Sequence, residues 1–172
     1  AGVSTLAVLA AAPALAQSNN SNVNQTGTGG QVDVGQDGSN ALSTVNQGGA
    51  GNQANVDQSG DGAESLVTQD NGTGSSDDGN LATVSQDGDS YSVVSQTNDD
   101  GFASVEQDGD GHLSSVSQSG EDDSAFVEQT GVSNSSAVNQ SGSSNFAAVG
   151  QGGGGNSSAV TQESGLNAAI VD

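Results

Sequence analysis

The sequence predicts an all-β protein, a two-sheet β-solenoid of about seven turns in which each 22-residue turn contains two 11-residue units. Three observations support this fold. The tripeptide Val-x-Gln returns thirteen times, almost always eleven residues apart. Alternate residues before each Gln are small or apolar, which is the period of a strand with one buried face. A Gly-rich connecting segment, here called an arc, follows nearly every Gln and supplies the reversal.

The repeat is defined by thirteen glutamines, each numbered as position 0 of its copy. They are Gln25, Gln36, Gln47, Gln58, Gln69, Gln86, Gln96, Gln107, Gln118, Gln129, Gln140, Gln151 and Gln162. Their spacing is 11 residues, except for 17 from Gln69 to Gln86 and 10 from Gln86 to Gln96. Position −2 is always Val, and position −4 is Ser in odd copies and Ala in even copies, apart from Val32. This alternation makes the true repeat 22 residues long, and it continues past an insertion at about residues 70–79, which we interpret as a longer loop.

The inward face of each strand carries positions −6, −4, −2 and 0, since these are two residues apart. Position −6 is often Asn, as at Asn52, Asn80 and Asn145. Like strands would stack on like strands, so that two sheets enclose a thin interior of Val, Ala, Ser, Gln and Asn. Stacked amides bond to the copies above and below, as in cross-β structures. We therefore expect a ladder built from the thirteen glutamines together with Asn52, Asn80 and Asn145.

A helical alternative exists, because eleven residues is also a coiled-coil period. Nearly every arc contains Gly, and Ser and Asn fill the repeats, which weakens a helix. No apolar stripe at i, i+3 and i+4 is present. The placement of charge agrees with the solenoid, because Asp123 alone among the 21 acidic residues falls at an inward position.

The composition excludes several function classes. The chain has no Lys or Arg and a net charge of −21, so nothing can neutralise nucleic-acid phosphates. It has no Cys, and His112 is the single near-neutral base. A lone His is more often structural than a ligand, and the Asp-Gly-Asp-Gly run at 108–111 lacks the remaining spacing of a calcium loop. We expect no enzymatic activity, no cofactor and no specific metal site.

The N-terminal segment differs from the repeats. Residues 3–12 are apolar and uncharged, and Ala14-Leu15-Ala16 has the small residues of a cleavage site. We interpret residues 1–16 as a truncated secretory signal peptide and residues 17–172 as the repeat domain. The apolar stretch is too short to span a bilayer.

The motifs inside the repeats match a known pattern. Even copies read Asn-x-Ala-x-x-x-Gln, as from Asn52 to Gln58 and from Asn80 to Gln86. The element Gln-x-Gly recurs at Gln36, Gln58 and Gln107. Over nearly all of residues 19–172 the chain resembles the curlin repeat, S-x5-Q-x-G-x-G-N-x-A-x3-Q, of bacterial curli subunits.

The resemblance implies a function and a location. Curli subunits are secreted by Gram-negative bacteria and form extracellular, cell-surface amyloid fibres of the biofilm matrix, with a role in adhesion. Their partners are copies of themselves, a nucleator subunit, an outer-membrane secretion pore and a periplasmic chaperone. In that family the inward Gln and Asn side chains form the ladder on which the fibre grows.

Two further expectations concern the outer surface. Large apolar residues fall at outward positions of even copies, and we predict an outer apolar stripe for lateral packing or adhesion, made of Leu81, Phe102, Phe126, Phe146 and Ile170. Acidic residues recur in successive arcs, and their crowding in a stack is expected to raise their pKa values.

One other function class stays open at this point. A calcium-stabilised secreted β-roll, in an adhesin or a surface-layer protein, would also be acidic and repetitive. Its repeats are nine residues long, however, whereas the period here is eleven.

Overall fold

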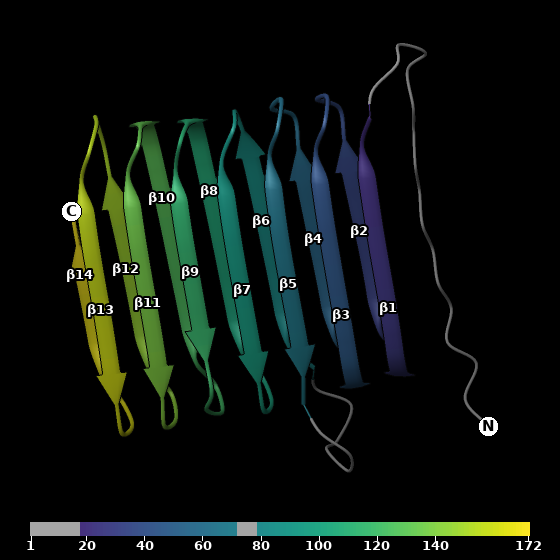
Figure 1. The fold of residues 1–172 in the computed structure, drawn as a ribbon. Coiled ribbons are helices and arrows are strands. Elements are labelled where there is room, and N and C mark those ends of the chain that lie inside the picture. The colour runs from purple at the N-terminus through teal and green to yellow at the C-terminus, as the bar shows by residue number, and fades with distance from the viewer. Residues whose placement is uncertain (1–17, 72–78) are drawn as a thin grey trace.

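The computed structural model describes residues 18–71 and 79–172 (Figure 1). These residues form two parallel sheets of seven strands each. Neither described segment contains a helix long and apolar enough to span a membrane. The first sheet contains β1 (Asn20–Thr28), β3 (Leu42–Ala50), β5 (Glu64–Asp70), β7 (Tyr91–Thr97), β9 (Leu113–Gln118), β11 (Ser135–Ser141) and β13 (Ser157–Glu163). The second contains β2 (Gln31–Gln36), β4 (Gln53–Gln58), β6 (Leu81–Asp87), β8 (Phe102–Asp110), β10 (Ser124–Val132), β12 (Phe146–Gln151) and β14 (Ala168–Val171).

The chain alternates between the two sheets, so one odd and one even strand make a turn. Figure 1 shows the strands advancing along one axis from the N-terminal to the C-terminal turn. Each strand pairs with the strand two places further on, and Val45 faces Val67 as Gln47 faces Gln69. The predicted two-sheet solenoid with a 22-residue repeat is confirmed.

The register is unchanged across the insertion. Gln58 pairs with Gln86 in one sheet, and Gln69 pairs with Gln96 in the other. Residues 72–78 of the insertion and residues 1–17, which include the expected signal peptide, lie outside the described residues. The division at residue 16 therefore stays a prediction.

The interior is thin and is filled by the inward positions. The Val residues at −2 from Val34 to Val160 are at most 7% exposed, and the Ala and Ser residues at −4 are mostly buried as well. Small residues at −4 allow the sheets to approach closely, while backbone pairing on both sides of each internal strand replaces a bulky core.

Candidate assembly site: the amide ladders and the ends of the solenoid

All thirteen glutamines point into the interior and form two continuous ladders. In the odd sheet each Nε2 donates to Oε1 of the next glutamine along Gln25, Gln47, Gln69, Gln96, Gln118, Gln140 and Gln162, with N···O distances of 2.7–2.9 Å. In the even sheet the chain of bonds runs along Gln36, Gln58, Gln86, Gln107, Gln129 and Gln151, at 2.8–3.0 Å. The bonds all have the same direction, from the N-terminal toward the C-terminal turn.

Each glutamine after Gln25 also bonds across the interior to the opposite sheet. Nε2 of Gln118 in β9 donates to the carbonyl oxygen of Phe102 in β8 at 2.9 Å. Nε2 of Gln140 donates in the same way to the carbonyl of Ser124 at 2.9 Å. Both amide protons are therefore used in the internal turns, which offsets the cost of burying them. The glutamines join neighbouring turns and also join the two sheets.

The asparagines at position −6 act differently from the glutamines. Oδ1 of Asn52 accepts the backbone N–H of Asn80 at 2.9 Å, and Oδ1 of Asn80 accepts that of Gly101 at 2.9 Å. Nδ2 of Asn145 donates to the carbonyl of Ser141, four residues earlier, at 3.3 Å. These side chains therefore hold each arc closed and attach it to the next turn.

Three further residues at position −6, which the expected ladder does not include, belong to the same group. Asn134 bonds in the same way as Asn145, with Nδ2 donating to the carbonyl of Thr130 at 3.0 Å. His112 and Asp123 occupy position −6 in other copies and are buried. The signal that identifies all three is their place in the repeat, since residue type alone does not reveal it.

The predicted outer apolar stripe lies on the outer face of the even sheet. The rings of Phe102 and Phe126 have centroids 5.1 Å apart, and those of Phe126 and Phe146 are 5.8 Å apart. Leu81 pairs with Phe102 in the adjacent strand, and Ile170 is 72% exposed. A second set of outward apolar residues, which the sequence analysis did not single out, lies on the odd sheet and comprises Leu42, Leu66, Tyr91, Val93 and Leu113.

Crowding of the arc acids is expected to raise their pKa values, but the pKa of Asp61 is shifted in the opposite direction. The hydroxyl and then the backbone N–H of Ser39 donate to Asp61, and they lower the pKa of that exposed carboxyl. A lowered folded-state pKa adds stability above the ordinary pKa of Asp, and this contribution is lost as the pH falls through the folded value. For Asp61 the expectation is wrong, because a hydrogen-bond donor from the neighbouring turn meets the carboxylate.

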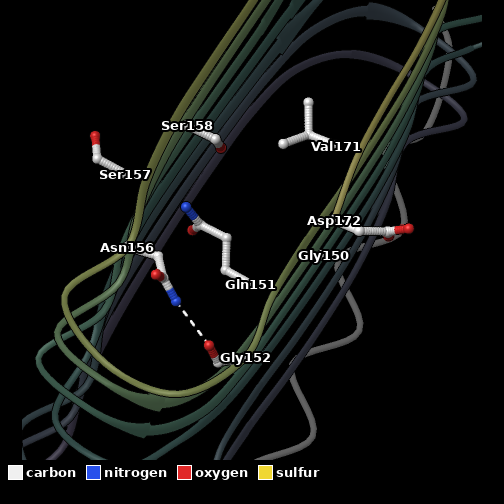
Figure 2. A pocket seen from close by; sticks show the side chains of 8 residues that line it. All are labelled: Gly150, Gln151, Gly152, Asn156, Ser157, Ser158, Val171 and Asp172. Carbon is white, nitrogen blue, oxygen red and sulfur yellow. Dashed lines mark hydrogen bonds between the residues drawn. The ribbon is translucent and has the colours of Figure 1, made fainter.

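The two ends of the solenoid differ in what they present. At the N-terminal end Oε1 of Gln25 is buried and accepts no hydrogen bond from residues 18–71 and 79–172. At the C-terminal end the interior opens into a cavity of about 330 Å³. Figure 2 shows the Gln151 amide in this opening, beside the hydrogen bond from Nδ2 of Asn156 to the carbonyl of Gly152. Nε2 of Gln162 donates to the carbonyl of Phe146, and its second proton has no ladder partner among the described residues.

The described residues offer little for metal chemistry. No group of three or more His, Asp or Glu side chains among residues 18–71 and 79–172 is placed to hold a metal ion.

Comparison with known proteins identifies the repeat. The family model of the curlin associated repeat matches residues 99–131 and 131–163, which span β8 to β13. No curated protein and no solved structure matches the chain significantly. The matched segments contain the C-terminal part of both glutamine ladders, from Gln107 to Gln162, and the contacts of Asn134 and Asn145. Residues 99–163 are therefore similar to the curlin associated repeat.

Proposed function

We propose that this protein is the structural subunit of an extracellular, curli-like amyloid fibre that grows by the addition of copies end to end. The observation that carries the proposal is the pair of glutamine ladders, which run through the described turns and end in complementary groups. One end offers the Oε1 acceptor of Gln25, and the other offers an Nε2 donor of Gln162.

The terminal strands of the odd sheet match in sequence as well as in chemistry. β13 carries Ser158, Val160 and Gln162 at positions −4, −2 and 0, and β1 carries Ser, Val and Gln at the same positions. A second copy placed with its β1 on β13 would continue the register found between internal strands. The main-chain groups on the outer edges of these strands would then pair as they do inside the molecule.

The direction of the ladders selects one mode of assembly. Two N-terminal ends brought together would place acceptors against acceptors, whereas N-terminal against C-terminal pairs an acceptor with a donor. Head-to-tail contact of this kind does not close on itself and gives an unbounded filament. The chain has 30% hydrophobic residues and a net charge of −21, so ordering on a template would offset the entropy that an isolated chain must lose.

The biological setting in this proposal follows the family. The fibre would belong to the biofilm matrix on the surface of a Gram-negative cell and would contribute to adhesion. Its subunits would be exported through an outer-membrane pore with a periplasmic chaperone, and a nucleator subunit would start growth.

The test is fibre growth of the purified chain, followed by thioflavin fluorescence with seeding and by negative-stain electron microscopy. Gln162→Glu replaces the end donor with a carboxylate that repels Oε1 of Gln25, so seeded elongation should fall at least about tenfold. The matched control is Asn139→Asp, which adds the same charge at an exposed outward position and should elongate as the unchanged chain does.

Two results would contradict the proposal. The first is a chain that stays a lone soluble particle at all concentrations, and the second is equal elongation of Gln162→Glu and Asn139→Asp. A chelator arm addresses the calcium-stabilised β-roll, because fibres should form with or without chelator. Loss of the β-structure on chelation would favour the β-roll.

A further inference from the structure

A depression of about 250 Å³ lies on the outer face of the even sheet, near its C-terminal end. Its floor is β12, whose outward residues here are Ala148 and Gly150. The neighbouring strand β10 carries Phe126 opposite Ala148 and Glu128 opposite Gly150. The depression exists because β12 has almost no outward side-chain volume next to these two large residues.

The aromatic wall of the depression is held in place by its neighbours. The Phe126 ring lies between those of Phe102 and Phe146, with ring centroids 5.1 and 5.8 Å away. Phe126 is nevertheless 41% exposed, so part of its side chain remains open to solvent. A ring packed between two others offers a preformed surface to a ligand.

Carboxylates lie on both sides of Gly150. Glu106 and Glu128 pair side by side in β8 and β10, and Asp172 follows β14 on the other side of β12. A Cβ added at Gly150 would lie 3.5 Å from Oδ1 of Asp172. Figure 2 shows the Asp172 side chain beside Gly150, pointing away from the interior that holds Gln151. Neighbouring strands are about 4.8 Å apart, so the row of carboxylates has a gap about two strand spacings wide at Gly150.

The chemistry of this gap selects the kind of cation that fits it. The chain has no Lys or Arg, so a second copy brings neither to this face. No group of three or more His, Asp or Glu among the described residues is placed to hold a metal ion. An ammonium with N–H groups is strongly hydrated, and exposed carboxylates such as Glu106 and Glu128 compete poorly with that water. A methylated ammonium instead has apolar surface to place on Ala148 and Gly150, and aromatic faces attract it.

We propose that this depression binds a small molecule with a methylated ammonium group, of the choline type. The cation lies over Gly150 and against the exposed part of Phe126. Glu128 and Asp172 flank it and supply the negative charge. A further copy added at the C-terminal end would lie beyond β14 and leave this outer face open, so binding does not depend on fibre growth.

The experiment titrates the folded full-length chain with choline and follows binding by saturation-transfer NMR. The first matched probe is the neutral isostere of choline in which carbon replaces nitrogen, and it should bind about two- to fivefold more weakly. The second is phosphocholine, which carries the phosphate of a lipid headgroup and should also bind more weakly, because the phosphate meets an acidic face. Choline binding should weaken between about 0.01 M and about 0.1 M salt, since the carboxylates are exposed.

Two pairs of variants locate the site. Gly150→Leu fills the depression and should abolish saturable binding, whereas Gly35→Leu, at the same position of β2, should leave it unchanged. A Cβ at either glycine meets no atom closer than 3.4 Å, so both side chains have room. Glu128→Gln removes one charge at constant size and should weaken binding about two- to fivefold. Glu163→Gln makes the same change on the odd sheet and should have no effect.

Three results would overturn the proposal. Equal affinity for choline and its neutral isostere would show that charge is not recognised, and tighter binding of phosphocholine would show that the ligand is a phosphate compound. Choline binding that survives Gly150→Leu would place the site elsewhere. Far-UV circular dichroism checks that each variant keeps its β-structure. If Gly150→Leu does not fold, equal binding by Glu128→Gln and Glu163→Gln would still contradict the proposal.

Discussion

His112 shows how a residue of different chemistry replaces asparagine at position −6. Its Nδ1 accepts the N–H of Asn134 at 3.2 Å, and its Nε2 lies 3.2 Å from the carbonyl of Asp108, four residues earlier. The amide can only donate and the carbonyl can only accept, so the geometry assigns the neutral tautomer with hydrogen on Nε2. The imidazole therefore reproduces the acceptor and the donor of an Asn side chain.

We expect His112→Asn to preserve stability and His112→Leu to reduce it by about 1–3 kcal/mol. Leucine leaves the N–H of Asn134 and the carbonyl of Asp108 buried without these partners, and an unsatisfied buried group costs about that much. The measurement is the denaturant midpoint of each variant. Leu113→Ala, at the exposed neighbouring residue, is the control and should change the midpoint little. A His112→Leu chain as stable as His112→Asn would disprove this role.

The sequence predicts the direction of a side chain correctly where that direction depends only on the position in the repeat. The inward direction of Gln118, for example, follows from the period of two. Its bond to the Phe102 carbonyl in the opposite sheet does not follow, because it depends on the distance between the sheets. The same limit applies to Asn145. Its burial follows from its position in the repeat, but its hydrogen bond to the Ser141 carbonyl depends on the path of the arc, which the pattern of residues does not give.

At the scale of elements, the strands range from four to nine residues in length, although the repeat itself is regular. The longest ones continue into the arcs, since arc residues also pair with the next turn in parallel. Thr28 faces Ala50 in this way at the end of β1. The pattern of apolar residues cannot give these ends, because backbone pairing in an arc does not require a buried side chain.

The arcs stack so closely that they need glycine at particular positions. Gly109 has a φ of +122°, and a Cβ added there would overlap the carbonyl oxygen of Gly131 in the next turn. A side chain would have to separate two turns that are hydrogen-bonded on both sides. Glycine is therefore required at Gly109 by backbone conformation and by stacking.

We expect Gly109→Ala to destabilise the solenoid by about 2 kcal/mol or more, from backbone strain together with the clash. Gly152→Ala is a matched control in an equivalent arc, because the nearest atom to its added Cβ is Oγ1 of Thr130 at 3.8 Å. Denaturant unfolding of the two variants should separate them clearly. Equal midpoints for the two variants would show that the arcs have room for a side chain.

At the scale of the whole molecule, the sequence determines the architecture because one period governs every turn. The residue at position −4 distinguishes the two sheets, with Ser in one and Ala in the other. The structure pairs Ser114 with Ser136 and Ala103 with Ala125, and Val32, the exception in the sequence, pairs with Ala54. The distribution of surface apolar residues was predicted less completely. Leu113 is 46% exposed on the odd sheet, and its place in a cluster with Tyr91 emerges only from strand pairing.

The outer apolar stripe on the even sheet leads to a prediction about lateral association. Phe126 lies next to exposed carboxylates, since it shares a depression of about 250 Å³ with Glu106 and Glu128. Two such faces can approach only when these charges are screened, and the Debye length shortens from about 30 Å at 0.01 M salt to about 10 Å at 0.1 M. Bundling of fibres should therefore increase with salt while the fold stays unchanged.

Replacement of Phe102, Phe126 and Phe146 together by Ser removes the aromatic contacts and should abolish salt-dependent bundling and surface adhesion. The matched control replaces Leu42, Leu66 and Leu113 by Ser, which removes three outward apolar side chains from the opposite sheet. Electron microscopy across a salt series measures the bundling, and a retention assay measures the adhesion. If the Leu variant loses bundling and the Phe variant keeps it, the contact lies on the odd sheet. Because that sheet has far fewer outward carboxylates, bundling through it should also depend less on salt, so the salt series distinguishes the two faces independently.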